Sequence, residues 1–274
     1  ISGTNVTLNK PDGTQLSYLS VGTNGGFMDT QTLPATGTYA IVIDPSDVLT
    51  GAATLTLYDV PADVGQVLTS GVQAQAVTSV PGQNARFSFQ GTAGQKVSLV
   101  ASSISIPDYS YLAIYRPDGT QLTIVSVSQG GSNFIDTMTL PLTGTYIVRV
   151  DPQNANVGSA AVTLYNTPDV TGTITPGGAA VTVNIPTPGQ DARLTFSGTA
   201  GMKLSFNLTS VTIPDSTYVT LHGPDGTQLA AANAYQSQNG FIDTLTLPLS
   251  GTYTIMINPT GTNTGSIVVK AVKH

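Results

Sequence analysis

The chain has 274 residues, enough for about two domains on length alone, and its nine basic and fifteen acidic residues leave a net charge of −6. Charged residues make up only 9% of the chain, where about 25% is typical, and this weakly acidic balance argues against a nucleic-acid partner, which needs a basic surface. Cysteine is absent, so disulfides, thiolate nucleophiles and cysteine zinc sites are excluded, and no apolar run approaches the ~18–20 residues of a transmembrane segment.

The composition favours strands over helices. All fifteen acidic residues are Asp, and the chain contains 29 Gly and 17 Pro, which makes it a poor helix former. Thr, Ser, Val and Asn are abundant and suit strands and turns. Because 40% of the residues are hydrophobic, the chain can still bury a core, and we expect an all-β fold. The low charge and the lack of cysteine point to an extracellular or cell-surface location.

A long internal repeat dominates the sequence. The pattern Phe-x-Asp-Thr occurs at Phe27–Thr30, Phe134–Thr137 and Phe241–Thr244, in two equal steps of about 107 residues. Gly-Thr-Tyr recurs with the same period at Gly37, Gly144 and Gly251. Such a period is too long for a solenoid repeat of roughly 20–50 residues and matches a self-contained domain. The sequence therefore predicts tandem domains that arose by duplication.

The repeat divides the chain into three modules. Residues 71–168 and 169–274 are complete copies, and residues 1–70 match only the C-terminal half of the unit. The segments around Pro61–Gly65 and Pro168–Gly172 are predicted to be short, restricted linkers. A half sandwich exposes an apolar sheet face, which costs about 25 cal/mol per Å². We therefore expect the N-terminal strands of the first module to lie upstream or to come from another molecule by strand complementation or self-association, unless the chain is simply a trimmed fragment.

Each complete module is predicted to contain eight short strands, since turn signals recur about every 8–12 residues. In the second module the predicted strands lie near 72–79, 84–90, 95–104, 109–115, 120–127, 133–140, 144–150 and 159–165. By strand alternation Tyr146, Val148 and Val150 share one face, as do Phe134, Met138 and Leu140. These faces are expected to form the core between two packed sheets of an antiparallel jelly-roll or Greek-key β-sandwich.

The order of the motifs resembles a known family. Four segments carry the resemblance: Phe87–Leu99, Leu112–Leu122, Thr139–Val150 and Gly158–Tyr165. Together they are similar to the bacterial pre-peptidase C-terminal domain, a jelly-roll β-sandwich appended to secreted proteases and other exported proteins. The resemblance implies an extracellular accessory role in attachment, secretion or spacing. Some members bind calcium near acidic loops, but here the acidic run of many members is replaced by Ser128–Ser132.

Two sets of side chains are candidates for ligand binding. The weak candidates for a Ca²⁺ site, the one cofactor considered, are Asp108, Asp118, Asp136, Asp215, Asp225 and Asp243. The competing interpretation is structural: Asp136 lies by alternation on the apolar Phe134 face, where it would cap backbone N–H groups or pair with a recurring arginine, Arg86 or Arg193. The candidates for stacking on a sugar ring are Tyr109, Tyr111, Tyr218 and Tyr235, for which core or edge packing is the alternative.

Nothing in the sequence assembles a catalytic site. His222 is the only internal histidine, and the equivalent positions hold Tyr115 and Asn9. A nucleophile needs a base within reach and a third group to orient that base, and His222 has no such companions in the sequence. We therefore expect no enzyme activity. The sequence favours a non-catalytic extracellular structural or interaction protein, such as a surface protein or fibre subunit. The alternative is a carbohydrate- or matrix-binding accessory module of a secreted hydrolase.

Overall fold

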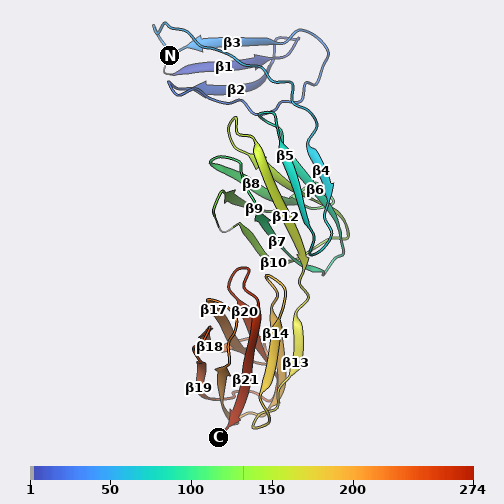
Figure 1. The fold of residues 1–274 in the computed structure, drawn as a ribbon, viewed down its shortest axis with the longest axis vertical. Coiled ribbons are helices and arrows are strands. Elements are labelled where there is room, and N and C mark those ends of the chain that lie inside the picture. The colour runs from blue at the N-terminus through green and yellow to red at the C-terminus, as the bar shows by residue number, and fades with distance from the viewer. Residues whose placement is uncertain (1–2, 132) are drawn as a thin grey trace.

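The computed structural model describes residues 3–131 and 133–274, and this part of the chain forms strands and no helix. The strands build repeated β-sandwich units that follow one another along the long axis of the molecule (Figure 1). The all-β fold class predicted from the sequence is confirmed. Within the same residues no helix is long and apolar enough to cross a membrane.

The second module is a two-layered sandwich. Its strands are β4 (Val64–Val67), β5 (Gln73–Thr78), β6 (Ala85–Gly91), β7 (Lys96–Ser102), β8 (Tyr109–Tyr115), β9 (Gln121–Ser128), β10 (Phe134–Thr139), β11 (Gly144–Pro152) and β12 (Gly158–Asn166). One sheet has the order β4-β6-β11-β8-β9 and the other β10-β7-β12-β5. Eight of these strands lie within a few residues of their predicted positions.

Strand β4 was not predicted. Its residues run parallel to β6, with Val64 opposite Ala85 and Val67 opposite Ser88. This pairing places residues 64–67 in a sheet of the second module, although they lie upstream of the predicted boundary at residue 71 and partly within a predicted linker. The linker signals, Pro61 and Gly65, therefore mark the start of an edge strand.

The third module repeats this architecture. Its strands are β13 (Val170–Thr173), β14 (Val181–Ile185), β15 (Ala192–Gly198), β16 (Lys203–Thr209), β17 (Ser216–His222), β18 (Gln228–Tyr235), β19 (Gly240–Thr246), β20 (Gly251–Pro259) and β21 (Gly265–Lys273). The two sheets have the orders β13-β15-β20-β17-β18 and β14-β21-β16-β19, which are the orders of the second module copied strand for strand. The duplicated sequence has therefore kept its topology.

The core of each complete module lies between its two sheets. Tyr146, Val148 and Val150 on β11 are fully buried, as predicted, and the equivalent residues of β20 are buried in the same way. Tyr146 stacks on Phe89 with ring centroids 5.3 Å apart, and its hydroxyl donates to the backbone oxygen of Leu142. The aromatic ring thus fills the core while its polar tip stays hydrogen-bonded.

The predicted orientation of β10 was wrong at Phe134 but right after the bulge, where Met138 packs against the core and Leu140 is 0% exposed. A bulge between Ile135 and Met138 shifts the alternation of this strand, so that Ile135 points into the core and is 4% exposed. In the third module Ile242 is likewise buried, while Phe241 is 53% exposed. The Phe134 face is consequently the outer face, and Asp136, which shares it, is exposed and does not point toward apolar surroundings. A single extra residue in a strand reverses which side chains face inward.

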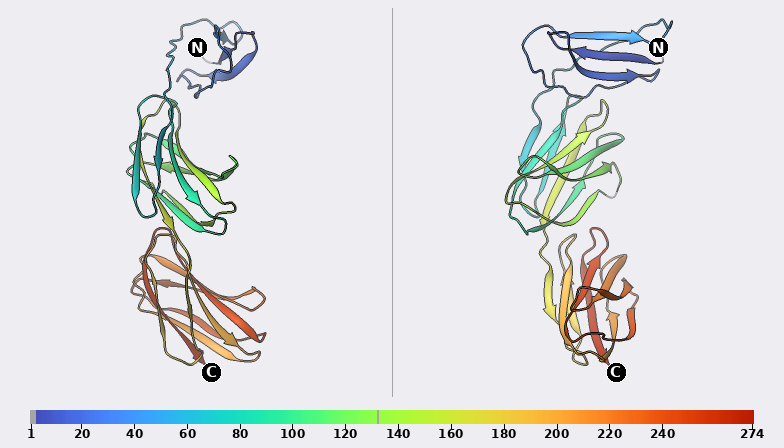
Figure 2. Two further views of the ribbon diagram at one scale, coloured as in Figure 1. Left: turned by 90° about the vertical axis from the view of Figure 1, so that its right-hand side faces the viewer. Right: turned by 180° about the vertical axis from the view of Figure 1, so that it is seen from behind.

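The first module has one sheet. Strands β1 (Thr4–Asn9), β2 (Gln15–Val21) and β3 (Ala40–Pro45) pair in the order β2-β1-β3, which corresponds to β9-β8-β11. Residues 51–59, which match β12 in sequence, form no strand, because the counterparts of its partners β5 and β7 are missing from the described part of this module. Figure 2 shows the single layer of the first module beside the double layers of the other two.

The open face of the first module exposes residues that are core elsewhere. Ile41 is 42% exposed, whereas the equivalent Val148 and Ile255 are 0% and 1% exposed. Leu55 and Leu57, which match core-forming positions of β12, are also exposed. The same residue pattern therefore forms a core only where a second sheet covers it.

Candidate functional site

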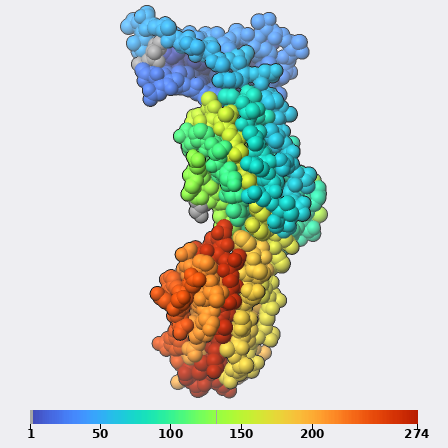
Figure 3. Space-filling view, in the orientation of Figure 1, coloured from blue at the N-terminus to red at the C-terminus, as the bar shows by residue number. Residues whose placement is uncertain are grey.

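Ion pairs and hydrogen bonds cluster where the second and third modules meet. We call the contact between the second and third modules the second joint, and the contact between the first and second modules the first joint. Figure 3 shows the modules in end-to-end contact at both places. The joints decide how the tandem units are oriented, so their geometry bears directly on what the protein can do.

A single carboxylate ties the second joint together. The Asp169 Oδ1 atom lies 2.6 Å from Lys96 Nζ, on β7 of the second module, and its Oδ2 accepts from Arg193 Nε, on β15 of the third. Burial alone would raise the pKa of Asp169, but the hydrogen bonds from Lys96 and Arg193 outweigh it and hold the pKa below its ordinary value. The side chain of Asp169 is only 12% exposed, so these ion pairs are weakly screened by solvent.

A tight turn of the third module docks onto the second. Ser98, 1% exposed, donates its hydroxyl to the backbone oxygen of Pro188 at 2.7 Å. Gly189 has a φ of +77°, and a Cβ there would lie 2.8 Å from Ser98 Cβ and 3.0 Å from Phe134 Cζ. Only glycine fits both this backbone conformation and this close approach. The Phe134 ring, wrongly predicted to be core, therefore belongs to the joint.

The connecting chain is fixed by hydrogen bonds on both sides. Thr167 is fully buried, its amide donates to the Lys96 oxygen at 2.9 Å, and its hydroxyl contacts that of Thr137. Gln190 reaches back from the docked turn and donates its side-chain amide to the Pro168 oxygen at 2.7 Å. The linker is thus hydrogen-bonded to both modules that it connects.

Asp191 gives the second joint a titratable group near neutral pH. This residue follows the docked turn and is 8% exposed. Burial raises the pKa of Asp191 to about 6, with smaller contributions from the carboxylates of Asp169 and Asp136, while Lys96 and Arg193 oppose the shift. The joint therefore holds one carboxylate with a lowered pKa and one with a raised pKa.

The first joint repeats the docked turn with different partners. Gly82, at φ +85°, occupies the place of Gly189, and its oxygen accepts from the Thr30 hydroxyl at 2.7 Å. Gln83 donates to the Ala62 oxygen at 3.1 Å, as Gln190 does to Pro168. Asn84 replaces Asp191, so this joint lacks the buried carboxylate at that position.

The predicted calcium ligands do not converge. Asp118 and Asp225 each accept from the amide and hydroxyl of the threonine two residues later, Thr120 or Thr227, and these hydrogen bonds lower the pKa of both carboxyls. Among residues 3–131 and 133–274, no three His, Asp or Glu side chains gather closely enough to hold a metal ion. Of the serine-rich segment that replaces the acidic run, Ser132 lies outside the described residues.

The remaining candidate aspartates also bond locally. Asp136 and Asp243 accept from the next residue's amide, at 2.7 and 2.6 Å, as the structural interpretation predicted. Asp108 and Asp215 have positive φ and accept from Asn156 and Asn263, at 3.1 and 3.3 Å. The predicted pairing with an arginine is not the one observed, because Arg193 pairs with Asp169.

The tyrosine candidates lie on the outer faces of the five-stranded sheets. Tyr109 and Tyr111 meet edge to face at 5.5 Å and 79°, an arrangement that does not form a flat platform. Tyr218 and Tyr235 are 45% and 43% exposed on β17 and β18. His222 sits in its own hairpin, with its ring nitrogens near the Thr220 hydroxyl and the Gly226 oxygen.

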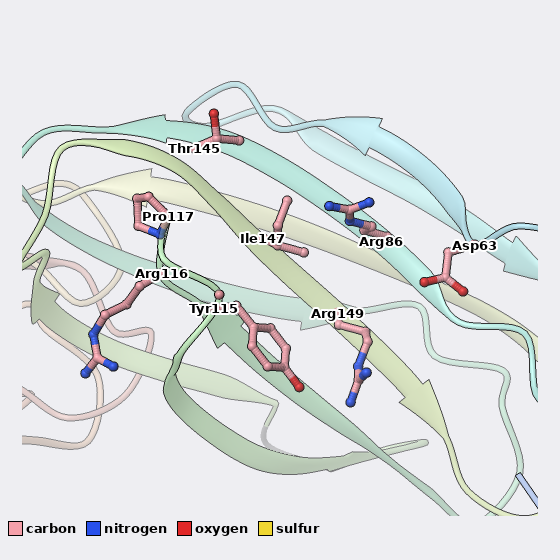
Figure 4. Close-up of a pocket in the computed structure, with 9 residues that line it drawn as sticks. Asp63, Arg86, Tyr115, Arg116, Pro117, Thr145, Ile147 and Arg149 are labelled. Carbon is pink, nitrogen blue, oxygen red and sulfur yellow. The ribbon is translucent and has the colours of Figure 1, made fainter. Parts of the chain in front are cut away.

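One open depression lies on the five-stranded sheet of the second module (Figure 4). It encloses about 500 Å³ and is lined by Asp63, Arg86, Tyr115, Arg116, Pro117, Gly119, Thr145, Ile147 and Arg149. We call it the arginine depression, because it holds three of the chain's four arginines. Sequence reasoning missed it, since the three arginines come from distant motifs, although the register of β6 against β11 would have brought two of them together.

Comparison with known proteins gives a distant structural similarity. No family model and no curated protein matches the sequence. The pre-peptidase C-terminal domain of a Bacillus anthracis collagenase is similar to 39% of this chain and 98% of that one, with 12% identity and a TM-score of 0.32. A periplasmic inhibitor of g-type lysozyme from Aeromonas hydrophila is similar over 38% of this chain and 99% of that one, with 16% identity and a TM-score of 0.27.

Proposed function

We propose that the protein is a non-catalytic, extracellular structural or interaction protein in which tandem β-sandwich modules act as a stiff spacer. The observation that carries this proposal is the second joint, where Asp169 binds Lys96 of one module and Arg193 of the next. Tandem domains joined only by a flexible linker move independently of each other. A linker that is hydrogen-bonded to both modules, beside a docked turn and a buried ion pair, opposes that motion.

The repetition of the joint supports a mechanical role. The same turn docks at Gly82 and at Gly189, so the repeat carries its own contact to the module before it. A chain that repeats one contact extends in one direction. The outer faces of the modules then stay available for attachment, spacing or display.

The unpaired sheet of the first module is the place where further protein binds in this proposal. Strand β3 has a free edge, and Ile41, Leu55 and Leu57 are exposed on or beside it. Strands that carry the repeat's own sequence fit this site, because in the second module β6 pairs with the edge of β11 and β7 belongs to the sheet that covers the same face. Such strands, from this polypeptide or another copy, would complete the sandwich.

Small-angle scattering of the intact chain tests the spacer. The proposal expects a profile that fits one extended arrangement of modules, and expects Asp169→Asn to broaden the ensemble. Scattering from the unaltered protein that fits only a broad mixture of module orientations would reject the stiff spacer. Electron microscopy of the same sample shows whether the chains add end to end, the outcome expected if one copy completes another.

A further inference from the structure

We propose that the arginine depression of the second module binds an acidic polysaccharide through its carboxylate or sulfate groups. This goes beyond the spacer function, because the depression lies on the exposed face of one sheet and not at a joint. The spacer proposal and the polysaccharide proposal rest on different residues, with the exception of Asp63. Its carboxylate lines the depression and also accepts a hydrogen bond from the backbone amide of Asn84 beside the first joint.

Two arginines on neighbouring strands line the depression. Arg86 on β6 and Arg149 on β11 are directly opposite in the antiparallel register. Opposite residues of this kind have Cβ atoms about 4.5–5.5 Å apart, and like charges at such positions are destabilising. In the structure the two guanidinium groups turn away from each other, and that of Arg149 lies over the Tyr115 ring of the neighbouring strand β8, so anionic groups bound at the two arginines relieve the repulsion at separate points (Figure 4).

The neighbouring acids do not satisfy these arginines. Asp151 lies 3.3 Å from an Nη atom of Arg149, but the Nε atom of Arg149 is buried and has no hydrogen-bond partner among the described residues. Asp63 is the single carboxylate among the lining residues, which include three arginines. The lining therefore carries a positive excess in a chain whose net charge is −6, although Asp151 and Asp118 lie beside Arg149 and Arg116 at its margin.

A third arginine adds a second point of attachment. The Arg116 Nη1 atom donates to the Thr120 hydroxyl and the Gln121 oxygen, which anchors the guanidinium but leaves other N–H groups free. Arg149 lies opposite Ala113 of β8, and Arg116 directly follows the end of that strand, three residues beyond Ala113 and a backbone step of about 10 Å. Figure 4 shows the Tyr115 ring between Arg116 and Arg149, and the Arg149 guanidinium lies 5.3 Å from the ring centroid.

This spacing and shape select the ligand. Guanidinium groups bind carboxylate, sulfate and phosphate oxygens in a forked geometry. A backbone step of about 10 Å between the two arginine positions exceeds the width of one oxyanion, so a chain that carries several anionic groups engages both. The site is an open sheet surface flanked by Thr145 and Ile147, which suits an extended polymer better than an enclosed small molecule. Nucleic acid also carries repeated oxyanions, so single-stranded DNA serves as the comparison polymer in the test.

The third module shows that the fold does not need these arginines. Met256 stands opposite Arg193 where the second module has Arg149 opposite Arg86. Gly223 stands in the place of Arg116. The cluster is therefore a feature of one copy of a duplicated domain, and the other copy supplies a substitution that the fold tolerates.

The test titrates the full chain with polygalacturonate and a sulfated dextran, with neutral dextran, inorganic sulfate and single-stranded DNA as comparisons. We expect polymer binding that weakens with salt and falls at least ten-fold in Arg149→Met, while Lys270→Met, which removes one exposed charge from the third module, keeps its affinity. Thermal unfolding midpoints show whether each variant is folded. If Arg149→Met lowers the midpoint, Arg86→Gln at an exposed position provides the second test of polymer binding.

Several results would overturn the proposal. These are the absence of polymer binding, unchanged binding in both arginine variants, an equal loss in Lys270→Met, or equal binding of DNA. Competition by inorganic sulfate at the same concentration of anionic groups would overturn the two-point attachment. Preference for polygalacturonate or for sulfated dextran identifies which oxyanion the site takes.

Discussion

Lys96 and Asp169 are 73 residues apart in sequence, yet their charged atoms lie 2.6 Å apart across the second joint. The same carboxylate accepts from Arg193, so one acid holds a cation from each of two modules. A partly buried carboxylate with two cationic partners is well compensated, and removal of any one partner leaves charge that water cannot fully solvate. The orientation of the third module therefore depends on a small number of side chains that can be changed individually.

Asp169→Asn is expected to destabilise the third module and loosen the second joint. The amide cannot form two ion pairs, and the loss of hydrogen bonds to charged groups corresponds to about 1.5–3 kcal/mol. Scanning calorimetry of the full chain measures the effect as a lower unfolding midpoint. Asp59→Asn, at an exposed position of the first module, is the matched control and should leave the midpoint nearly unchanged. Equal effects of the two substitutions would show that the ion pairs do not support the joint.

Gly189→Ala is expected to be more destabilising than Gly201→Ala. Both glycines have positive φ, at +77° and +85°, so both variants carry a similar backbone strain. A Cβ at Gly201 meets nothing within 4 Å, whereas one at Gly189 meets Ser98 and Phe134 of the second module. We expect the contact to add about 1–3 kcal/mol to the loss of stability. Denaturant unfolding gives the difference, and equal losses would mean that the turn is not docked.

The stability of the folded chain is expected to depend on pH through the protonation of Asp191. Its folded pKa of about 6 lies above the ordinary value of 3.8, so the folded protein holds a proton that the unfolded chain has lost between these values. The contribution of Asp191 to stability is therefore full below about pH 4, declines up to about pH 6, and stays at its lowest above that.

Asp191→Asn tests this directly, because the second module has Asn84 at the same position. The variant should gain stability at pH 7, by at most about 3 kcal/mol, and gain little at pH 3. Urea unfolding at the two pH values measures the gain. An equal change in unfolding free energy at pH 3 and pH 7 would mean that the pKa of Asp191 lies near its ordinary value.

The same substitution at two equivalent isoleucines reports whether the first module is completed. Ile255→Ala removes a side chain that is 1% exposed, with an expected loss of about 2–5 kcal/mol. Ile41 is 42% exposed, so Ile41→Ala should have a much smaller effect on the chain alone. If complementing strands bind the open face, Ile41→Ala should weaken end-to-end assembly in sedimentation experiments. Assembly that is insensitive to Ile41→Ala would place the contact elsewhere.

The fold could be predicted well because its strand ends and buried faces are marked by residues that are close together in the sequence. Turn residues mark the strand ends, and the alternation around Tyr146 identifies the buried face of β11. The alternation failed at Phe134, since a bulge has no distinct sequence signal and reverses the faces of the strand. Strand β4 was missed because a short, parallel edge strand next to Pro61 resembles a linker.

The candidate sites were less predictable, since each depends on contacts between distant strands. Arg193 was considered as a partner of the aspartate in the Phe-x-Asp-Thr motif, but in the structure it pairs with the linker residue Asp169. Arg86 and Arg149 form a cross-strand pair because of the strand register, which the sequence alone did not specify. The six aspartates were considered as a set because they recur, and they recur because each stabilises its own turn or strand end.

The stiffness of the second joint is the central claim, and a distance measurement between spin labels tests it most directly. The chain has no cysteine, so Gln121→Cys and Gln228→Cys, two exposed and equivalent positions on β9 and β18, can be labelled cleanly. Pulsed electron paramagnetic resonance should give a narrow distribution of distances in the otherwise unaltered chain and a broad one after Asp169→Asn. A distribution that is already broad with Asp169 in place would contradict the account.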